Sequence, residues 1–237
     1  LLVGPAPVPH RAAVSPSHPS PNFGDRRGRA VELVVLHYTV LDCAEALDRL
    51  CDPVAEVSAH YLIDRDGTVL SLVDETHRAW HAGAGTWRGE GDVNSRSIGI
   101  ELANSGAEPF ADPQMLALER LLADILGRHA LPPAAVIGHS DMAPDRKSDP
   151  GARFDWRRLA LQGLAVWPDP DRPGAHRPRD FKADLCAFGF PDAPPDTLLA
   201  AFRLRFRPGA NGPLDDTDRA LAAGLRRFAV DASPGDA

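Results

Sequence analysis

The sequence predicts an α/β fold: a mixed central β-sheet flanked by helices, followed by a small all-α C-terminal domain. Short apolar runs rich in β-branched residues alternate with stretches of helical spacing over the first two thirds of the chain. A turn signal, Asp66-Gly67, separates two such runs as in a hairpin. After a proline-rich stretch, the last part of the chain has helical spacing only.

The predicted strands differ in how they are buried. Residues 31–38 are almost continuously apolar, which is typical of a central strand covered on both faces. Residues 97–102 alternate, so that three apolar side chains share one face and Glu101 points to the other. Further strands are predicted at 61–63, 69–73 and 135–139. The pattern does not define the order of the strands.

Helical spacing is clearest after Asp112-Pro113, where an N-cap and a proline at the first helical position precede a long amphipathic stretch. A shorter helix is predicted after Asp42, with Glu45 three residues on as in a capping box. Three more helices are predicted near 180–188, 195–206 and 215–230.

These elements divide the chain into five segments. We expect an N-terminal arm at 1–29, a larger α/β domain at 30–167, a linker at 168–177, a three-helix domain at 178–231 and a tail at 232–237. A bundle of ~50 residues is only marginally stable alone. We therefore expect it to lean on the larger domain.

Composition excludes several functions. The formal net charge is -7 and no Lys/Arg stripe is present, so nucleic acid is not an expected partner. No apolar run approaches the ~20 residues that span a bilayer. The three cysteines form no CxxC pair, which favours a reducing compartment. We expect a cytoplasmic protein, or a periplasmic or outer-membrane-associated one if a signal segment has been removed.

Candidate metal ligands stand at the ends of two predicted strands. His37 ends the most buried strand, His139 ends another, and Asp149 follows ten residues later. Three such ligands with a fourth position open to water define a catalytic zinc site. The residues alone leave the choice open, because the chain has nine histidines and a histidine at a strand end usually packs within the core.

Five stretches carry a resemblance to a known family. They are VVLHYT (34–39), VSAHYLIDRDGTV (57–69), RAWHAG (78–83), SIGIELAN (97–104) and GHSDMAPDRKSDPG (138–151). In content and order they resemble the zinc-dependent N-acetylmuramoyl-L-alanine amidases of the second type, which include phage-lysozyme-like amidases and peptidoglycan recognition proteins. AAFRLRFRP (200–208) is similar to the peptidoglycan-binding-like helical domain of the AmiD-type branch.

The resemblance implies a site and an activity. It implies one Zn²⁺ per chain held by His37, His139 and Asp149, with Glu101 as general base and Lys147 offsetting charge on the tetrahedral oxygen. Asp149 matches the branch that uses aspartate where animal-type relatives use cysteine. The implied reaction is hydrolysis of the amide bond between (anhydro-)N-acetylmuramic acid and L-alanine in muropeptides and anhydro-muropeptides, in cell-wall recycling.

A substrate wall is predicted in the loop at 77–96. Its candidates are Tyr38, Trp80, His81, Arg88 and Asn94. Tryptophan faces can pack on sugar rings, and arginine can pair with a peptide carboxylate. Ordinary loop packing is an equally open interpretation of these residues, and Trp80 in particular is also a candidate core residue.

Two other functions remain open at this point. One is a non-catalytic peptidoglycan-binding protein, against which the complete ligand set weighs. The other is a zinc hydrolase of another amide on the same fold. The phenylalanines at core spacing in 178–231 favour a supporting role for that domain over wall binding.

Overall fold

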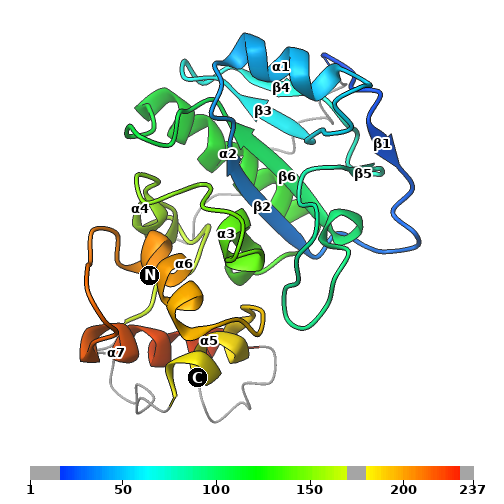
Figure 1. Cartoon of the computed structure of the whole chain (residues 1–237). Coiled ribbons are helices and arrows are strands. Elements are labelled where there is room, and N and C mark those ends of the chain that lie inside the picture. Colours follow the sequence, from blue (N-terminus) through cyan, green and yellow to red (C-terminus); the bar gives the residue numbers. More distant parts are fainter. Residues whose placement is uncertain (1–16, 170–179, 230–237) are drawn as a thin grey trace, which may run out of the picture.

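The computed structural model describes residues 17–169 and 180–229 and confirms the α/β fold (Figure 1). The predicted tail and most of the predicted linker lie outside the described residues. A five-stranded mixed sheet has the order β4-β3-β6-β2-β7. Its strands are β2 (Leu33–Tyr38), β3 (Tyr61–Ile63), β4 (Val69–Ser71), β6 (Ser97–Leu102) and β7 (Val136–Gly138).

Parallel pairing dominates the sheet. The central strands β2 and β6 run parallel, as do β2 with β7 and β3 with β6. Only β4 is antiparallel, and it forms the predicted hairpin with β3. A second, two-stranded sheet pairs β1 (Phe23–Gly24) with β5 (Arg78–Ala79).

Helices cover both faces of the sheet. They are α1 (Cys43–Cys51), α2 (Asp112–Arg128), α3 (His139–Met142), α4 (Trp156–Leu161), α5 (Phe181–Phe188), α6 (Pro195–Phe206) and α7 (Asp216–Leu225), with 3-10 turns at Val93–Arg96, Pro133–Ala135 and Arg226–Phe228. One face packs against α2 and α4, as Val34, Ile98 and Leu118 show. The other face carries α1 over β3, and α3 with the C-terminal helices over β2 and β7.

Several boundaries differ from the sequence prediction, and β2 and β4 are shorter than predicted. Asp112 is the first residue of α2 rather than its N-cap, which is Ala111. The last helix ends at Leu225, where a 3-10 turn follows. His139 begins α3 instead of ending a strand, because Asp141 Oδ2 accepts the Gly138 N–H at 2.8 Å and turns the chain.

The described part of the predicted N-terminal arm packs closely on the larger domain. Ser20 and Asn22 are buried and donate to backbone carbonyls around the end of α1, such as Leu50 O at 2.6 Å from Ser20 Oγ. Arg26 is buried as well, and its Nη1 donates to the Ser95 and Ser97 carbonyls at 3.0 Å. These bonds tie the arm to the N-terminal end of β6.

A buried ion pair joins the C-terminal helices to the larger domain. Arg205 of α6 bonds to Asp141 of α3, and both side chains are almost fully buried. Arg205 Nη2 also donates to the Val136 carbonyl at 3.2 Å, and the guanidinium lies 4.1 Å from the ring centre of Trp156. One arginine of the small domain thereby fixes the turn from β7 into α3. Within the described part of the chain, no helix is long and apolar enough to cross a membrane.

We predict that Arg205→Met lowers the free energy of unfolding by about 3–5 kcal/mol, because it leaves Asp141 buried without its partner charge. Urea unfolding of the metal-free protein measures this. The double variant with Asp141→Asn should recover part of the loss. Arg65→Met, which removes an exposed pair with Glu108, should change stability little. Equal effects of the two arginine variants would contradict the importance of the buried pair.

Candidate metal centre and active site

The sheet register brings the central site residues together. Glu101 of β6 lies directly beside His37 of β2. Leu36 and Ile100, their neighbours in sequence, point into the core against α2, so His37 and Glu101 point to the opposite face. Because β7 ends at Gly138 beside Leu36, His139 follows at the same edge of the sheet.

Asp149 reaches this edge from the turn that follows α3. Its carbonyl accepts the Ser140 N–H at 3.0 Å, which holds the turn against the start of the helix. The Asp149–Pro150 peptide bond is cis. Pro150 lies so close to Gly138 that a Cβ there would come within 2.8 Å of Pro150 Cδ. Glycine at 138 is thus required for the turn to approach β7.

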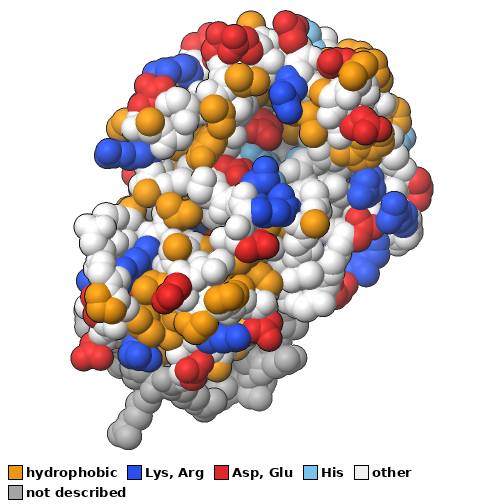
Figure 2. Space-filling model, in the orientation of Figure 1, with side chains coloured by type: hydrophobic (Ala, Val, Ile, Leu, Met, Phe, Trp, Pro, Cys, Tyr) orange, Lys and Arg blue, Asp and Glu red, His pale blue; other side chains and the backbone are white. Residues whose placement is uncertain are grey.

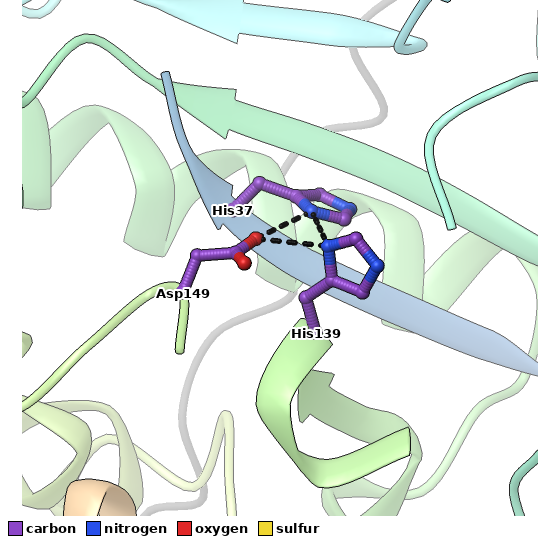
Figure 3. A group of neighbouring side chains, drawn as sticks. All are labelled: His37, His139 and Asp149. Atoms are coloured by element: carbon purple, nitrogen blue, oxygen red, sulfur yellow. Dashed lines mark hydrogen bonds and ion pairs between the residues drawn. The ribbon is translucent and has the colours of Figure 1, made fainter. Parts of the chain in front are cut away.

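Three ligand atoms converge in this place (Figure 3). His37 Nδ1 lies 2.9 Å from His139 Nδ1 and 2.8 Å from Asp149 Oδ2, and the third side of the triangle is 3.0 Å. All three residues are buried. One ion that bonds nitrogen and oxygen at about 2.0–2.2 Å can reach all three atoms.

The protonation states fit a metal. Burial is the main cause that lowers the pKa of His37 to about 4, which keeps this imidazole neutral. Burial opposes the charge on Asp149, but the adjacent rings of His139 and His37 bring its pKa below the usual range. The second nitrogen of His139, Nε2, lies 2.8 Å from the Ala82 carbonyl and donates to it, so Nδ1 carries a lone pair. Converging acceptors of this kind are a set of groups that could hold a metal cation.

Glu101 has the surroundings of a general base. It lines the same pocket, and its Oε2 is buried without a hydrogen-bond partner among the described residues. Burial, and then the charge of Asp149, raises the pKa of Glu101 to about 8. Lys147 opposes that rise, and its exposed side chain lines the pocket beside Asp149.

The pocket has a volume of about 400 Å³ and lies on the face of the sheet between α1 and the turn after α3. Figure 2 shows it as a hollow with acidic and histidine side chains at its bottom and basic side chains at its rim. Its lining residues are His37, Tyr38, Thr39, Val40, Leu41, Ala46, Arg49, Leu50, Val57, Ser58, Trp80, His81, Glu101, His139, Arg146, Lys147, Ser148 and Asp149.

The predicted substrate wall is divided by the structure. Tyr38, Trp80 and His81 line the pocket, whereas Arg88 and Asn94 do not. Arg88 points to the C-terminal helices, where its Nη2 donates to the Phe228 carbonyl at 3.2 Å. Asn94 is buried beneath the loop, and its Oδ1 accepts the backbone N–H groups of His81 and Ala82 at 3.0 and 2.8 Å.

Two arginines of the pocket were not predicted from the sequence. Arg49, in the last turn of α1, is exposed and makes no hydrogen bond or ion pair within the described residues. Arg146 donates to the carbonyls of Ala82 and Ala84. The sequence carries one signal for Arg49. It lies beside the buried Leu50 on α1, the helix that follows strand β2 and its candidate ligand His37.

A buried two-histidine, one-aspartate cluster at the bottom of a pocket, with a carboxyl and an amine beside it, has the ligand types that a mononuclear metallohydrolase uses. The family model described as N-acetylmuramoyl-L-alanine amidase matches residues 27–152, more than half of the chain. The chain belongs to this family.

Individual relatives agree with the family match over a larger part of the chain. The N-acetylmuramoyl-L-alanine amidase AmiD of Escherichia coli is 36% identical, with 82% of each chain covered. The structure of AmiD in complex with the substrate anhydro-N-acetylmuramic acid-L-Ala-D-γ-Glu-L-Lys matches with a TM-score of 0.73, and covers 88% of this chain and 92% of that one. The structure of AmpDh3 from Pseudomonas aeruginosa, 31% identical, matches with a TM-score of 0.76 and covers 94% and 98%.

We predict that Asp149→Ala loses the metal, because the carboxylate is the only anionic ligand of the three. Elemental analysis after zinc loading and dialysis measures this. Asp145→Ala is the matched control, since Asp145 is an exposed aspartate of the same turn and should keep full zinc content. Equal zinc in both variants would remove Asp149 from the ligand set.

Proposed function

We propose that the chain is a zinc-dependent amidase that hydrolyses the bond between (anhydro-)N-acetylmuramic acid and L-alanine in peptidoglycan fragments, in cell-wall recycling. The observation that carries the proposal is the convergence of His37, His139 and Asp149 at the bottom of a pocket that also contains Glu101 and Lys147. The anhydro substrate in the AmiD complex supports the choice of substrate class. A cytoplasmic location, expected from the three unpaired cysteines, is part of the proposal.

The ligand set fits zinc, whose catalytic sites have three protein ligands, two histidines and a carboxylate among the known sets, and leave the fourth position open. Zinc, when bound, supplies a Lewis acid for the scissile carbonyl and lowers the pKa of water. Glu101 accepts the proton of the attacking water and delivers it to the leaving amine of L-alanine. Its buried Oε2, without a protein partner, is free to accept that proton.

Lys147 provides positive charge at the mouth of the site. Its exposed amine has no acceptor among the described residues and lies in the pocket lining next to Asp149. It offsets the negative charge that develops on the carbonyl oxygen as water adds. One electrostatic donor of this kind contributes about 3–4 kcal/mol to the transition state.

The experiment is an incubation of the zinc-loaded protein with anhydro-muramyl tripeptide, followed by mass spectrometry of the products. We expect free tripeptide that disappears after chelation and returns with zinc. Lys147→Ala should keep its zinc and lose about 10²–10³-fold in kcat. Bound zinc without release would indicate another amide substrate, and the absence of both would indicate a recognition protein without activity.

In this proposal Arg49, and not Arg88, binds a carboxylate of the stem peptide. Arg49 lies in the pocket lining with its charge unpaired, as a partner for a carboxylate of the stem peptide requires. Tyr38 and Trp80 provide half-buried aromatic surface for the sugar and peptide. Arg88 instead bonds to the C-terminal helices.

We predict that Arg49→Ala raises KM about 3–10-fold with little change in kcat, since the contact is equal in ground and transition states. Arg88→Ala is the matched control and should leave KM unchanged. Steady-state kinetics on anhydro-muramyl tripeptide measure both. A larger KM effect of Arg88→Ala would reverse the assignment.

A further inference from the structure

One short segment, His81-Ala82, contacts the outer ring nitrogens of both proposed histidine ligands. Their outer nitrogens are the Nε2 atoms, since the Nδ1 atoms converge on the metal position. His139 Nε2 lies 2.8 Å from the Ala82 carbonyl. His37 Nε2 lies 3.0 Å from His81 Nδ1, so a second histidine ring, not a carbonyl or carboxylate, faces the first ligand.

A chain of hydrogen bonds determines which nitrogen of His81 carries the proton. Ser97 Oγ lies 2.6 Å from the Val93 carbonyl, and only the hydroxyl can donate in that contact. The oxygen of Ser97 is therefore left as an acceptor for His81 Nε2–H, 3.2 Å away. With its proton on Nε2, His81 offers Nδ1 as an acceptor.

The tautomer of His81 in turn determines the tautomer of His37. His81 Nδ1 accepts Nε2–H from His37, so the single proton of the neutral His37 ring lies on the outer nitrogen. Nδ1 of His37 then presents a lone pair toward Asp149 Oδ2 and His139 Nδ1. The order Val93, Ser97, His81, His37 is the one that leaves the ligand atom unprotonated.

Three features keep the His81-Ala82 segment in place. Gly99 of β6 lies under the ring, where a Cβ would come within 2.4 Å of His81 Cγ. Asn94 holds the backbone by accepting the N–H groups of both His81 and Ala82. Arg146 donates to the Ala82 carbonyl as well, at 2.5 Å. The segment is therefore fixed from the strand, from the core and from the pocket side.

We propose that His81 is a positioning residue of the zinc site, which orders the proton of His37 through Ser97, while Asn94 fixes the segment that holds both histidine ligands. This inference rests on the zinc site of the proposed function. It assigns His81 and Asn94 to the metal's outer surroundings instead of to the substrate wall. Outer partners of histidine ligands typically contribute about 10–100-fold in metal affinity.

The experiment compares zinc affinity, by competition with a chromogenic chelator, in four variants and the unmodified protein. His81→Leu removes the acceptor and should weaken zinc binding about 10–100-fold. His81→Asn keeps an acceptor oxygen near the Nδ1 position and should restore most of the affinity. Ser97→Ala leaves the His81 ring but frees its proton, and should give an intermediate loss.

The fourth variant, His60→Leu, controls for damage to the fold. His60 is a buried histidine whose ring centre lies 5.8 Å from that of His81, but its nitrogens contact Gly99, His77 and Arg26 and neither proposed histidine ligand. It should lower the unfolding temperature and leave zinc affinity near that of the unmodified protein. A loss equal to that of His81→Leu would show a merely structural effect and overturn the proposal.

Nitrogen-15 NMR of the imidazoles in the zinc-loaded protein gives a second measurement. The His37 ring should carry its proton on Nε2 in the unmodified protein, and Ser97→Ala should broaden or shift that signal. An unchanged His37 signal together with unchanged zinc affinity in His81→Leu would overturn the inference while the zinc site itself stands. An unmodified protein that binds no zinc would overturn both.

Discussion

The parallel pairing of β2 with β6 and β7 is the constraint on which the site depends. It places His37 beside Glu101 in register and delivers His139 to the same edge of the sheet. Residues of adjacent buried strands cannot shift against each other without exposing a core face, because a slip of one residue exchanges the two faces. The proposed ligand His37 and the proposed base Glu101 are thus held at a fixed separation by backbone hydrogen bonds before any side chain contributes.

Buried hydrogen bonds hold the loop segment that lies next to these strand residues. The Ala82 carbonyl accepts from both His139 and Arg146, and Asn94 holds the backbone of the same segment. A buried network of this kind stabilises one arrangement only when its members are satisfied. Here each outer nitrogen of the two histidines has a partner, whereas Oε2 of Glu101, in the same pocket, has none among the described residues.

Local pattern was enough to predict most elements, because hydrophobic periodicity reports which face is buried. It located β2, β6 and α2, and it found Asp42 as the N-cap of α1. It could not tell where the residues of the 77–96 loop point, since a loop has no period. Arg88 and Asn94 were therefore grouped with Trp80, although one bonds to the C-terminal helices and the other to the loop backbone. The ligands themselves came from resemblance, because nine histidines offer no internal choice.

The same loop connects the active site with the C-terminal helices. Trp87, fully buried, packs edge-on against Phe188 of α5, while His81 six residues earlier faces His37. Leu33, Val35 and Ile137 of the sheet share one apolar core with Phe202 of α6. Without the small domain, this face of β2 and β7 would meet water directly beneath the ligands. The C-terminal helices are accordingly part of the packing that supports the proposed metal centre.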